Sequence, residues 1–524
     1  VRRAPNCANY FTTLVRKINQ SNAIPVALCP TNGDKILSME TSRKLKDYYL
    51  HLKTHKLRAF MGVLFIIAGG GLLIRAGYSF HPNFGPDAAL PTQSLYFFRL
   101  YTENTNSLMG FLAGGFLLIS GFSLLVFSNL AERARLSWII LNAFFCLIIF
   151  GFLVDHSLYL LKAVNPDEWL IGDWLINYQG GFVRRGLIGE ILLTLSRVSG
   201  VSYVPMVVIL QMGLYLAILI NTFRLAVKAP LSPLSAMLVY SPAFMLFPVL
   251  DPQGAFRKEI LLLALLSSIC AHYASSEKVR RPWVLPAAVG FASVILVLNH
   301  EMLAPYLPYI VGAVIISERG FSKTARNTLI AILPSILVTV ILLFFARGDK
   351  EAVAAICGSL QAGSPFSCNT HGAIASIGEN VSIAHQFVLL HSAGETRLVY
   401  LVSALLSVIP LVLILVKSQV RSWMNQKMLS WLLILISVSI IGTLPLLWVA
   451  ADYGRLIYIH IGCLSLLALL LLANIPKEPF HLEPYHLLMW GVFFLYIYSW
   501  RLIHYDAHME KAFPILSWII ALIT

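Results

Sequence analysis

The feature that most constrains this chain is a series of apolar runs, each close to the 17 to 25 or so residues that a helix needs to cross a bilayer. They recur near 57–77, 107–128, 137–154, 204–223, 232–250, 260–275, 283–299, 302–317, 328–346, 398–416, 428–450, 456–473 and 486–503. Hydrophobic residues make up 58% of the chain and charged residues 12%, whereas soluble domains carry about 25% charged residues. The sequence therefore excludes a soluble globular protein. It predicts an all-α, polytopic transmembrane helix bundle of about 12–14 spans.

Residues 1–56 differ from the rest because they are polar, basic and free of apolar runs. We expect them to form a cytoplasmic tail ahead of a single transmembrane domain, residues 57–524. Within the tail, Met39 opens a stretch that reads as a native N-terminus. We therefore expect residues 1–38 to be disordered or not native.

The distribution of charge predicts how the spans are oriented. Lys and Arg gather before the first span, at 43–58, and in every second loop after it, which places those loops in the cytoplasm by the positive-inside rule. Basic loops facing an anionic membrane surface also account for the formal charge of +14, so nucleic acid is not an expected partner. The outward loops, of which 155–203 and 347–397 are the longest, instead mix acidic and basic residues in compact clusters.

The first outward cluster, DWLINYQGGFVRRGLIGE, places Asp173, Tyr178, a Gly-Gly pair, Arg184 and Arg185 between apolar segments. Guanidinium groups are permanently charged and forked, so an adjacent pair suits a phosphate or pyrophosphate. The alternative is a positive-inside anchor, which the predicted outward position disfavours. The residues that follow, 186–198, predict an outward interfacial amphipathic helix.

Three further outward clusters mix charges in the same way. They are DPQGAFRKE with Asp251, Arg257 and Lys258, NHEMLAP with His300 and Glu301, and ADYGRLIYIH with Asp452 and Arg455. Cations in the first turn of a helix oppose its dipole, so a bound anion would explain Arg257 and Lys258; snorkelling to lipid phosphate is the alternative. Glu301 could act as a base or merely cap a helix, and Asp452 and Arg455 are spaced for a local ion pair. No zinc-type spacing occurs near these residues, so we expect no metal site.

Two of the seven cysteines, Cys357 and Cys368, lie together in the outward loop 347–397. A disulfide closing a loop of this length would stabilise it by about 3 kcal/mol, and an oxidising compartment such as the bacterial periplasm would permit it. Two free thiols are the alternative.

With these clusters and the many-span layout in view, the chain resembles bacterial O-antigen and exopolysaccharide polymerases and, more loosely, GT-C glycosyltransferases. The resemblance implies a glycosyltransferase in the bacterial inner membrane, with a periplasmic active site and a polyprenyl-(pyro)phosphate-linked sugar as donor. Its partners would be membrane lipid, the lipid-linked glycan and glycan-assembly proteins. GT-C enzymes carry a catalytic acid after their first span, where this chain has only Asp87 and Glu103, so Asp155 or Asp173 would have to supply it.

The charges suggest how such an enzyme would work. Arginines would hold the pyrophosphate and stabilise its charge as it leaves, while Asp173, Glu301 or Asp251 would accept a proton from the attacking hydroxyl. We assign catalytic roles to Asp173, Arg184, Arg185 and Glu301, and substrate-binding roles to Tyr178, Asp251, Arg257, Lys258, His300, Asp452 and Arg455. No cofactor is required if the arginines suffice, and a divalent cation is the alternative.

A transporter or flippase of an anionic lipid-linked glycan is the competing interpretation. Such proteins place charges near the bilayer midplane and contain inverted repeats, and neither feature is evident in the sequence.

Overall fold

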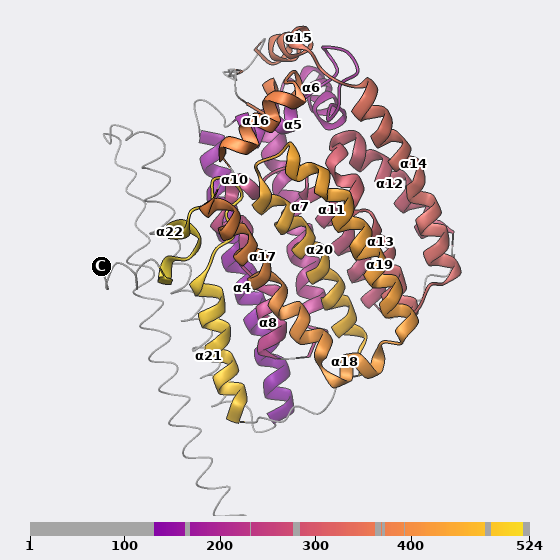
Figure 1. Ribbon diagram of the computed structural model, residues 1–524, viewed down its shortest axis with the longest axis vertical. Coiled ribbons are helices and arrows are strands. Elements are labelled where there is room, and N and C mark those ends of the chain that lie inside the picture. Colours follow the sequence, from indigo (N-terminus) through magenta and orange to yellow (C-terminus); the bar gives the residue numbers. More distant parts are fainter. Residues whose placement is uncertain are drawn as a thin grey trace, which may run out of the picture. The chain divides into compact units, whose positions relative to one another are not determined.

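The computed structural model describes residues 130–162, 168–230, 232–275, 283–361, 368, 372–391, 394–476 and 484–516. Every regular element in these ranges is a helix, as Figure 1 shows. The longer helices are α4 (Leu130–Lys162), α6 (Leu187–Ser199), α7 (Tyr203–Ala226), α11 (Ile260–Ala274), α12 (Val284–Asn299), α13 (Pro308–Glu318), α14 (Lys323–Phe345), α15 (Lys350–Gln361), α16 (Val381–His391), α17 (Glu395–Val416), α19 (Gln426–Thr443), α20 (Tyr453–Asn474) and α21 (Pro484–Ser499). Short helical turns connect them: η1 (Glu168–Gly172), α5 (Asp173–Leu175), α8 (Pro233–Val239), α9 (Phe247–Leu250), α10 (Pro252–Ala255), η2 (Glu301–Tyr306), η3 (Ala375–Ile377), α18 (Ser418–Trp423), η4 (Leu444–Trp448) and α22 (Met509–Ala512).

The predicted fold class, an all-α polytopic transmembrane bundle, is confirmed. Within the described residues, six helices are long and apolar enough to cross a membrane: Arg135–Leu161, Tyr203–Ala226, Lys323–Phe345, Glu395–Val416, Gln426–Trp448 and Tyr453–Asn474. Shorter apolar helices cover Ile260–Ala274, Val284–Asn299, Val381–His391 and Met489–Ser499. The expected tail 1–56, the expected spans 57–77 and 107–128, and the acids Asp87 and Glu103 lie outside the described residues.

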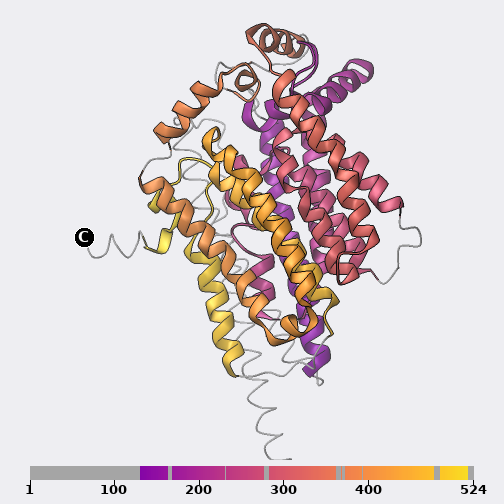
Figure 2. The same cartoon turned by 45° about the vertical axis from the view of Figure 1, so that its right-hand side comes forward.

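Helix α20 forms the centre of the bundle. Within its apolar window 72% of the residues are buried, against 22–44% for the other long apolar helices. It packs on α7, α11, α13 and α17, and Figures 1 and 2 show these helices running in roughly one common direction. Gly462 permits one of these contacts, because a Cβ there would lie only 3.0 Å from the side chain of Leu263 on α11.

Helices α7 and α11 run parallel, so the chain between them must cross back along the bundle. Their pairing follows three contacts in order: Gln211 donates to the carbonyl of Phe256, Asn221 donates to Ser268, and Lys228 donates to the carbonyl of Ala274. The return segment, which connects α7 to α11, was expected to form one helix over 232–250. It does not. It is broken into α8 and α9, because prolines at 242 and 248 lack the amide hydrogen that a continuous helix needs.

The three helices that follow the return segment are short for a membrane crossing. Helix α11 has 15 residues, α12 has 16 and α13 has 11; at about 1.5 Å per residue even α12 reaches only about 24 Å, short of the hydrocarbon thickness of about 30 Å. Irregular backbone at 256–259 and the 3-10 turn η2 extend these passes, and both are largely buried. Non-helical backbone is tolerated in a membrane only where protein covers it or it lines a cavity.

Figure 1 shows α5, α6 and α15 together at one end of the bundle, which we call the upper end, and α18 at the opposite, lower end. Helix α6 matches the expected amphipathic helix 186–198. It buries Leu192 and Leu193 and exposes Ile191, Leu195 and Val198, which recur at helical spacing as one apolar stripe.

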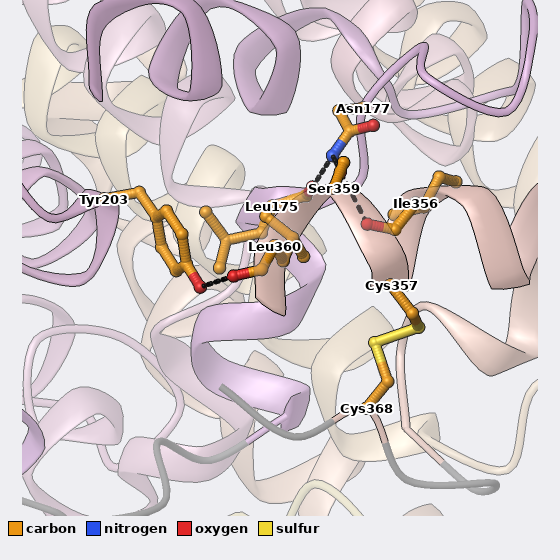
Figure 3. The surroundings of a disulfide bond; sticks show 8 residues. All are labelled: Leu175, Asn177, Tyr203, Ile356, Cys357, Ser359, Leu360 and Cys368. Atoms are coloured by element: carbon orange, nitrogen blue, oxygen red, sulfur yellow. Dashed lines mark hydrogen bonds between the residues drawn. A yellow bond between two sulfur atoms is a disulfide. The ribbon is translucent and has the colours of Figure 1, made fainter. Parts of the chain in front are cut away.

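Helix α15 lies on the loop between α5 and α6. Figure 3 shows the contacts: Asn177 donates to the hydroxyl of Ser359 at 3.1 Å, and Tyr203 donates to the carbonyl of Leu360 at 2.7 Å. In the same figure Cys357, on α15, forms a disulfide with Cys368, with their Cα atoms 5.8 Å apart. The loop, through Asn177, and the start of α7, through Tyr203, are therefore both bonded to α15 at the upper end.

Gly180 provides a test of this packing. A Cβ at this position would lie 2.5 Å from the backbone oxygen of Ala352 on α15, so Gly180→Ala should separate the two segments and lower stability by about 1–3 kcal/mol. The matched control is Gly358→Ala on α15, where nothing lies within 4 Å and alanine should raise stability by up to about 1 kcal/mol. Thermal unfolding of purified protein in detergent measures both. Equal melting temperatures for the two variants would contradict the packing described.

Candidate functional site

The loop between α5 and α6 has an unusual backbone that sets the direction of its two arginines. Arg185 has φ of 68° and Gly181 has φ of 99°, and the left-handed region costs a non-glycine residue about 1–2 kcal/mol. Two contacts hold this conformation: the amide of Arg184 donates to the carbonyl of Ala346 at 2.9 Å, and Lys258 Nζ donates to the carbonyl of Arg185 at 2.7 Å. The conformation turns the Arg185 side chain toward η2.

Arg185 and Glu301 form the central ion pair of the site. Arg185 Nε lies 3.1 Å from both carboxylate oxygens of Glu301, and Nη2 lies 2.8 Å from Oε1. Only 3% of the Glu301 side chain is exposed. Burial alone would raise the pKa of Glu301, but Arg185 outweighs it and holds that pKa well below its usual range. The carboxylate is therefore ionised at neutral pH and fully engaged.

Further contacts extend this pair into a chain of charges. Arg184 Nη1 lies 3.8 Å from Glu301 Oε1 on one side. On the other, His300 lies between Glu301 and Glu259, at 3.9 and 3.6 Å. Burial and the charge of Arg185 lower the pKa of His300 to about 4, so it is neutral at pH 7 and acts as a polar spacer between two carboxylates.

Arg455 completes the chain from the start of α20. Its Nη2 lies 2.9 Å from Glu259 Oε1, and its Nη1 lies 3.0 Å from Asp452 Oδ2. The expected local pair of Asp452 and Arg455 is therefore present, and Arg455 also reaches inward. Glu259, which received no role from the sequence, joins the two halves.

Asp173 is the one carboxylate of this group without a direct partner. It is 3% exposed, and within the part of the chain that the structure describes its carboxylate makes no hydrogen bond or ion pair shorter than 4.0 Å. Burial would raise its pKa, yet Lys258 and the other surrounding cations lower it to about 2. The neighbouring Lys258 is fully buried, and burial lowers its pKa to about 8 although Asp173 opposes the shift.

Arg257 lies at the edge of the same group. It donates to the carbonyl of Trp169 at 2.8 Å and stacks on that ring with its guanidinium carbon 5.0 Å from the ring centre. Its charge still interacts with those of Arg455 and Asp173. We call the complete set the charged cluster: Asp173, Arg184, Arg185, Arg257, Lys258, Glu259, His300, Glu301, Asp452 and Arg455. It contains five cations and four carboxylates.

Two expected site residues lie apart from the charged cluster. Tyr178 serves the fold of its own loop: its amide donates to Glu190 and its ring packs against Phe182 and Gly186. Burial and Glu190 raise the pKa of Tyr178 to about 12. Asp251 instead binds His504, a residue that the sequence reasoning missed, since only the short run IHYDAH marked it as polar.

The charged cluster holds four buried polar atoms that have no hydrogen-bond partner among the described residues. They are Arg184 Nε, Glu259 Oε2, His300 Nδ1 and Arg455 Nε. Such atoms are rare in folded proteins, and leaving one unpaired costs about 1–3 kcal/mol. These four belong to charged or titratable side chains of one buried group, where water or a polar ligand would satisfy them.

The described residues contain no group of three His, Cys, Asp or Glu side chains placed to hold a metal ion. A cavity of about 610 Å³ lies away from the cluster, at the lower ends of α7 and α11, lined by Asn221, Arg224, Lys228 and His272 among others. Short basic loops explain cations at that end, so we base the site on the charged cluster.

Comparison with known protein families gives a match over part of the chain. Residues 142–386 match the model of a family described as "Uncharacterised membrane protein Rv1490". The chain is a multi-pass membrane protein. No curated protein and no solved structure matches it. The matched residues contain the clusters around Arg185, Lys258 and Glu301, whereas Arg455 and His504 lie beyond them.

Removing the charge of Glu301 tests the central pair. Glu301→Gln keeps the size of the side chain but leaves Arg185 buried without a counter-charge, so it should lower the free energy of unfolding by about 3–5 kcal/mol. The control is Glu351→Gln, on the exposed first turn of α15.

The pair should also make stability depend on pH. Because the folded pKa of Glu301 is lowered, its contribution is complete above the unfolded pKa of about 4.3 and is lost as pH falls below that value. Melting temperatures from pH 7 to pH 3 should fall more steeply for wild type than for Glu301→Gln. Parallel profiles would contradict the assignment.

Proposed function

We propose that this chain is a membrane glycosyltransferase or polysaccharide polymerase that takes its sugar from a polyprenyl-(pyro)phosphate-linked donor at the upper end of the bundle. The observation that supports the proposal most is the convergence of Arg184, Arg185, Lys258 and Arg455 in one buried cluster, although they come from three segments far apart in the sequence. A (pyro)phosphate leaving group needs such preorganised cations to stabilise the charge that develops on it.

Arg184 is the cation best placed to contact the donor. Its side chain is 26% exposed, and its contacts are long, at 3.8 Å to Glu301 and 3.4 Å to the carbonyl of Ser376. Its Nε has no partner. By contrast, Glu301 engages Arg185 closely, so Arg185 would position Arg184 and contribute charge. A phosphate oxygen would satisfy the donors that Arg184 leaves unused.

Asp173 would bind a hydroxyl of the donor sugar. Its carboxylate has no partner in the structure's described part, and Glu301 and Asp251 are both occupied. The pKa of about 2 keeps it ionised, so it accepts hydrogen bonds well but is a weak base at neutral pH. This role differs from the proton acceptor that the sequence suggested.

The upper end would face the periplasm of a bacterial inner membrane. Two observations support this orientation: basic loops gather at the lower end, as the positive-inside rule requires of a cytoplasmic face, and the upper end carries the Cys357–Cys368 disulfide, which an oxidising compartment permits.

The test is transfer activity in reconstituted vesicles supplied with a polyprenyl-pyrophosphate oligosaccharide. Wild type should produce longer glycans, and Arg184→Ala should reduce the rate by about 10²- to 10³-fold while keeping its melting temperature. The control is Arg326→Ala, which removes the same charge from an exposed position near the lower end. Asp173→Asn should also lower the rate.

The competing interpretation predicts a different product. A flippase would move the lipid-linked glycan across the vesicle membrane without forming a glycosidic bond. If wild type moves the lipid-linked glycan across the membrane and forms no elongated product with any donor supplied, the proposed enzymatic function is overturned.

A further inference from the structure

The pair Asp251 and His504 forms a second polar site beside the charged cluster. Asp251 Oδ1 and Oδ2 both lie 2.8 Å from His504 Nδ1. The same carboxylate accepts the amide hydrogens of Gly254 at 3.1 Å and of His504 itself at 2.7 Å. An ionised carboxylate is only an acceptor, so these contacts require that Nδ1 carries a hydrogen.

The fixed tautomer leaves the other ring nitrogen as an acceptor. In neutral histidine the nitrogen without a hydrogen carries a lone pair, and in the neutral form of His504 that nitrogen is Nε2. No described contact uses it. The His504 side chain is 14% exposed, so the ring is held rigidly on one side and remains accessible on the other. Asp251 would also stabilise the imidazolium that forms when Nε2 takes up a proton.

The position of His504 relates this site to the charged cluster. The backbone carbonyl of His504 accepts the amide hydrogen of Gly454, one residue before Arg455. The two segments pack so closely that a Cβ on Gly454 would collide with the backbone of Ile503. The His504 carbonyl also accepts the hydroxyl of Tyr400. The segment around 504 is therefore packed against the start of α20, next to Arg455.

Aromatic rings lie near His504, whose ring centre is 6.3 Å from that of Tyr505. The ring centres of Tyr505 and Phe387 are 5.9 Å apart and the two rings are nearly parallel. The ring centres of His391 and Tyr505 are 5.7 Å apart. Phe387 is 46% exposed. Flat rings beside a hydrogen-bonding group offer an amphipathic surface of the kind that suits a sugar, which is apolar on its faces and polar at its edges.

We propose that the Asp251–His504 pair is the acceptor subsite and proton acceptor of the transferase, a role that rests on the proposed function. The acceptor hydroxyl would donate a hydrogen bond to His504 Nε2 and then give up its proton to it. The hydroxyl oxygen forms the new bond to the anomeric carbon of the donor sugar. The bond from that carbon to the phosphate oxygen breaks, and its electron pair leaves with the polyprenyl pyrophosphate beside Arg184.

The first experiment tests the ring nitrogen without requiring activity. Diethyl pyrocarbonate modifies unprotonated, accessible imidazole nitrogens, and peptide mass spectrometry follows each histidine separately. His504 should react faster than His300, which is 1% exposed. If His504 reacts no faster than His300, the inference is overturned, because Nε2 of His504 would then be inaccessible to the reagent.

The second experiment measures transfer by wild type, His504→Gln and His508→Gln. His508 is the matched control, since it also pairs with a carboxylate, Asp506, at 3.2 Å, but is 45% exposed. His504→Gln should slow transfer by about 10²- to 10⁴-fold with the KM for donor unchanged, and His508→Gln should match wild type. The variant should fold, because Gly254 and the residue-504 amide still bind Asp251.

Chemical rescue separates a proton-transfer role from a structural one. Added imidazole should restore part of the rate to His504→Ala and none to Arg184→Ala. If wild type catalyses transfer and the rate of His504→Gln is within threefold of the wild-type rate, this inference is overturned and the proposed function stands. Absence of transfer by wild type would instead overturn the proposed function, and this role with it.

Discussion

The upper end of the bundle depends on one buried ion pair, that of Arg185 with Glu301. Taking two charges out of water costs several kcal/mol each, and only close, multiple hydrogen bonds compensate for this. The pair meets that requirement with contacts of 2.8 and 3.1 Å. It requires Arg185 to adopt a left-handed backbone, and Lys258 stabilises that backbone by binding the carbonyl. The loop, the residues 256–259 and η2 are thereby joined at Arg185.

A second constraint comes from the membrane, which tolerates non-helical backbone only where protein covers it. Helices α11 and α12 stop short of a full crossing, and the residues that continue their paths, 256–259 and 300–306, are the ones that carry the charges. The charged groups therefore lie inside the protein rather than at a lipid-facing surface. This placement also explains why burial affects the pKa of Lys258 and His300 so strongly.

The sequence predicted the fold class and a common end of the bundle for the charged motifs, because both follow from hydrophobic length and from the alternation of loops. It left open whether the motifs around Arg185, Lys258, Glu301 and Arg455 would meet at that end. It could not predict which carboxylate meets which cation, since pairing depends on how far each helix is rotated about its axis. The part played by Glu259 emerges only from that rotation. Likewise, nothing in a run of apolar letters showed that 232–250 would break into short helices, or that a C-terminal histidine would return to Asp251.

The distribution of satisfied and unsatisfied groups separates two kinds of residue within the site. A cluster that served only to join helices would gain most stability by pairing every buried polar atom. Here Glu301 is fully paired and holds the loop, whereas Arg184, with an unpaired Nε, and Asp173, with an unpaired carboxylate, lie around it. Binding an anion requires fully paired charged side chains beside side chains with unused hydrogen-bonding atoms. The paired side chains are fixed in position, and they prevent the unpaired ones from bonding to each other. His504 follows the same rule, with Nδ1 fixed by Asp251 and Nε2 left open. The proposed function gives a partner to Arg184, Asp173 and His504, which a purely structural role leaves unexplained.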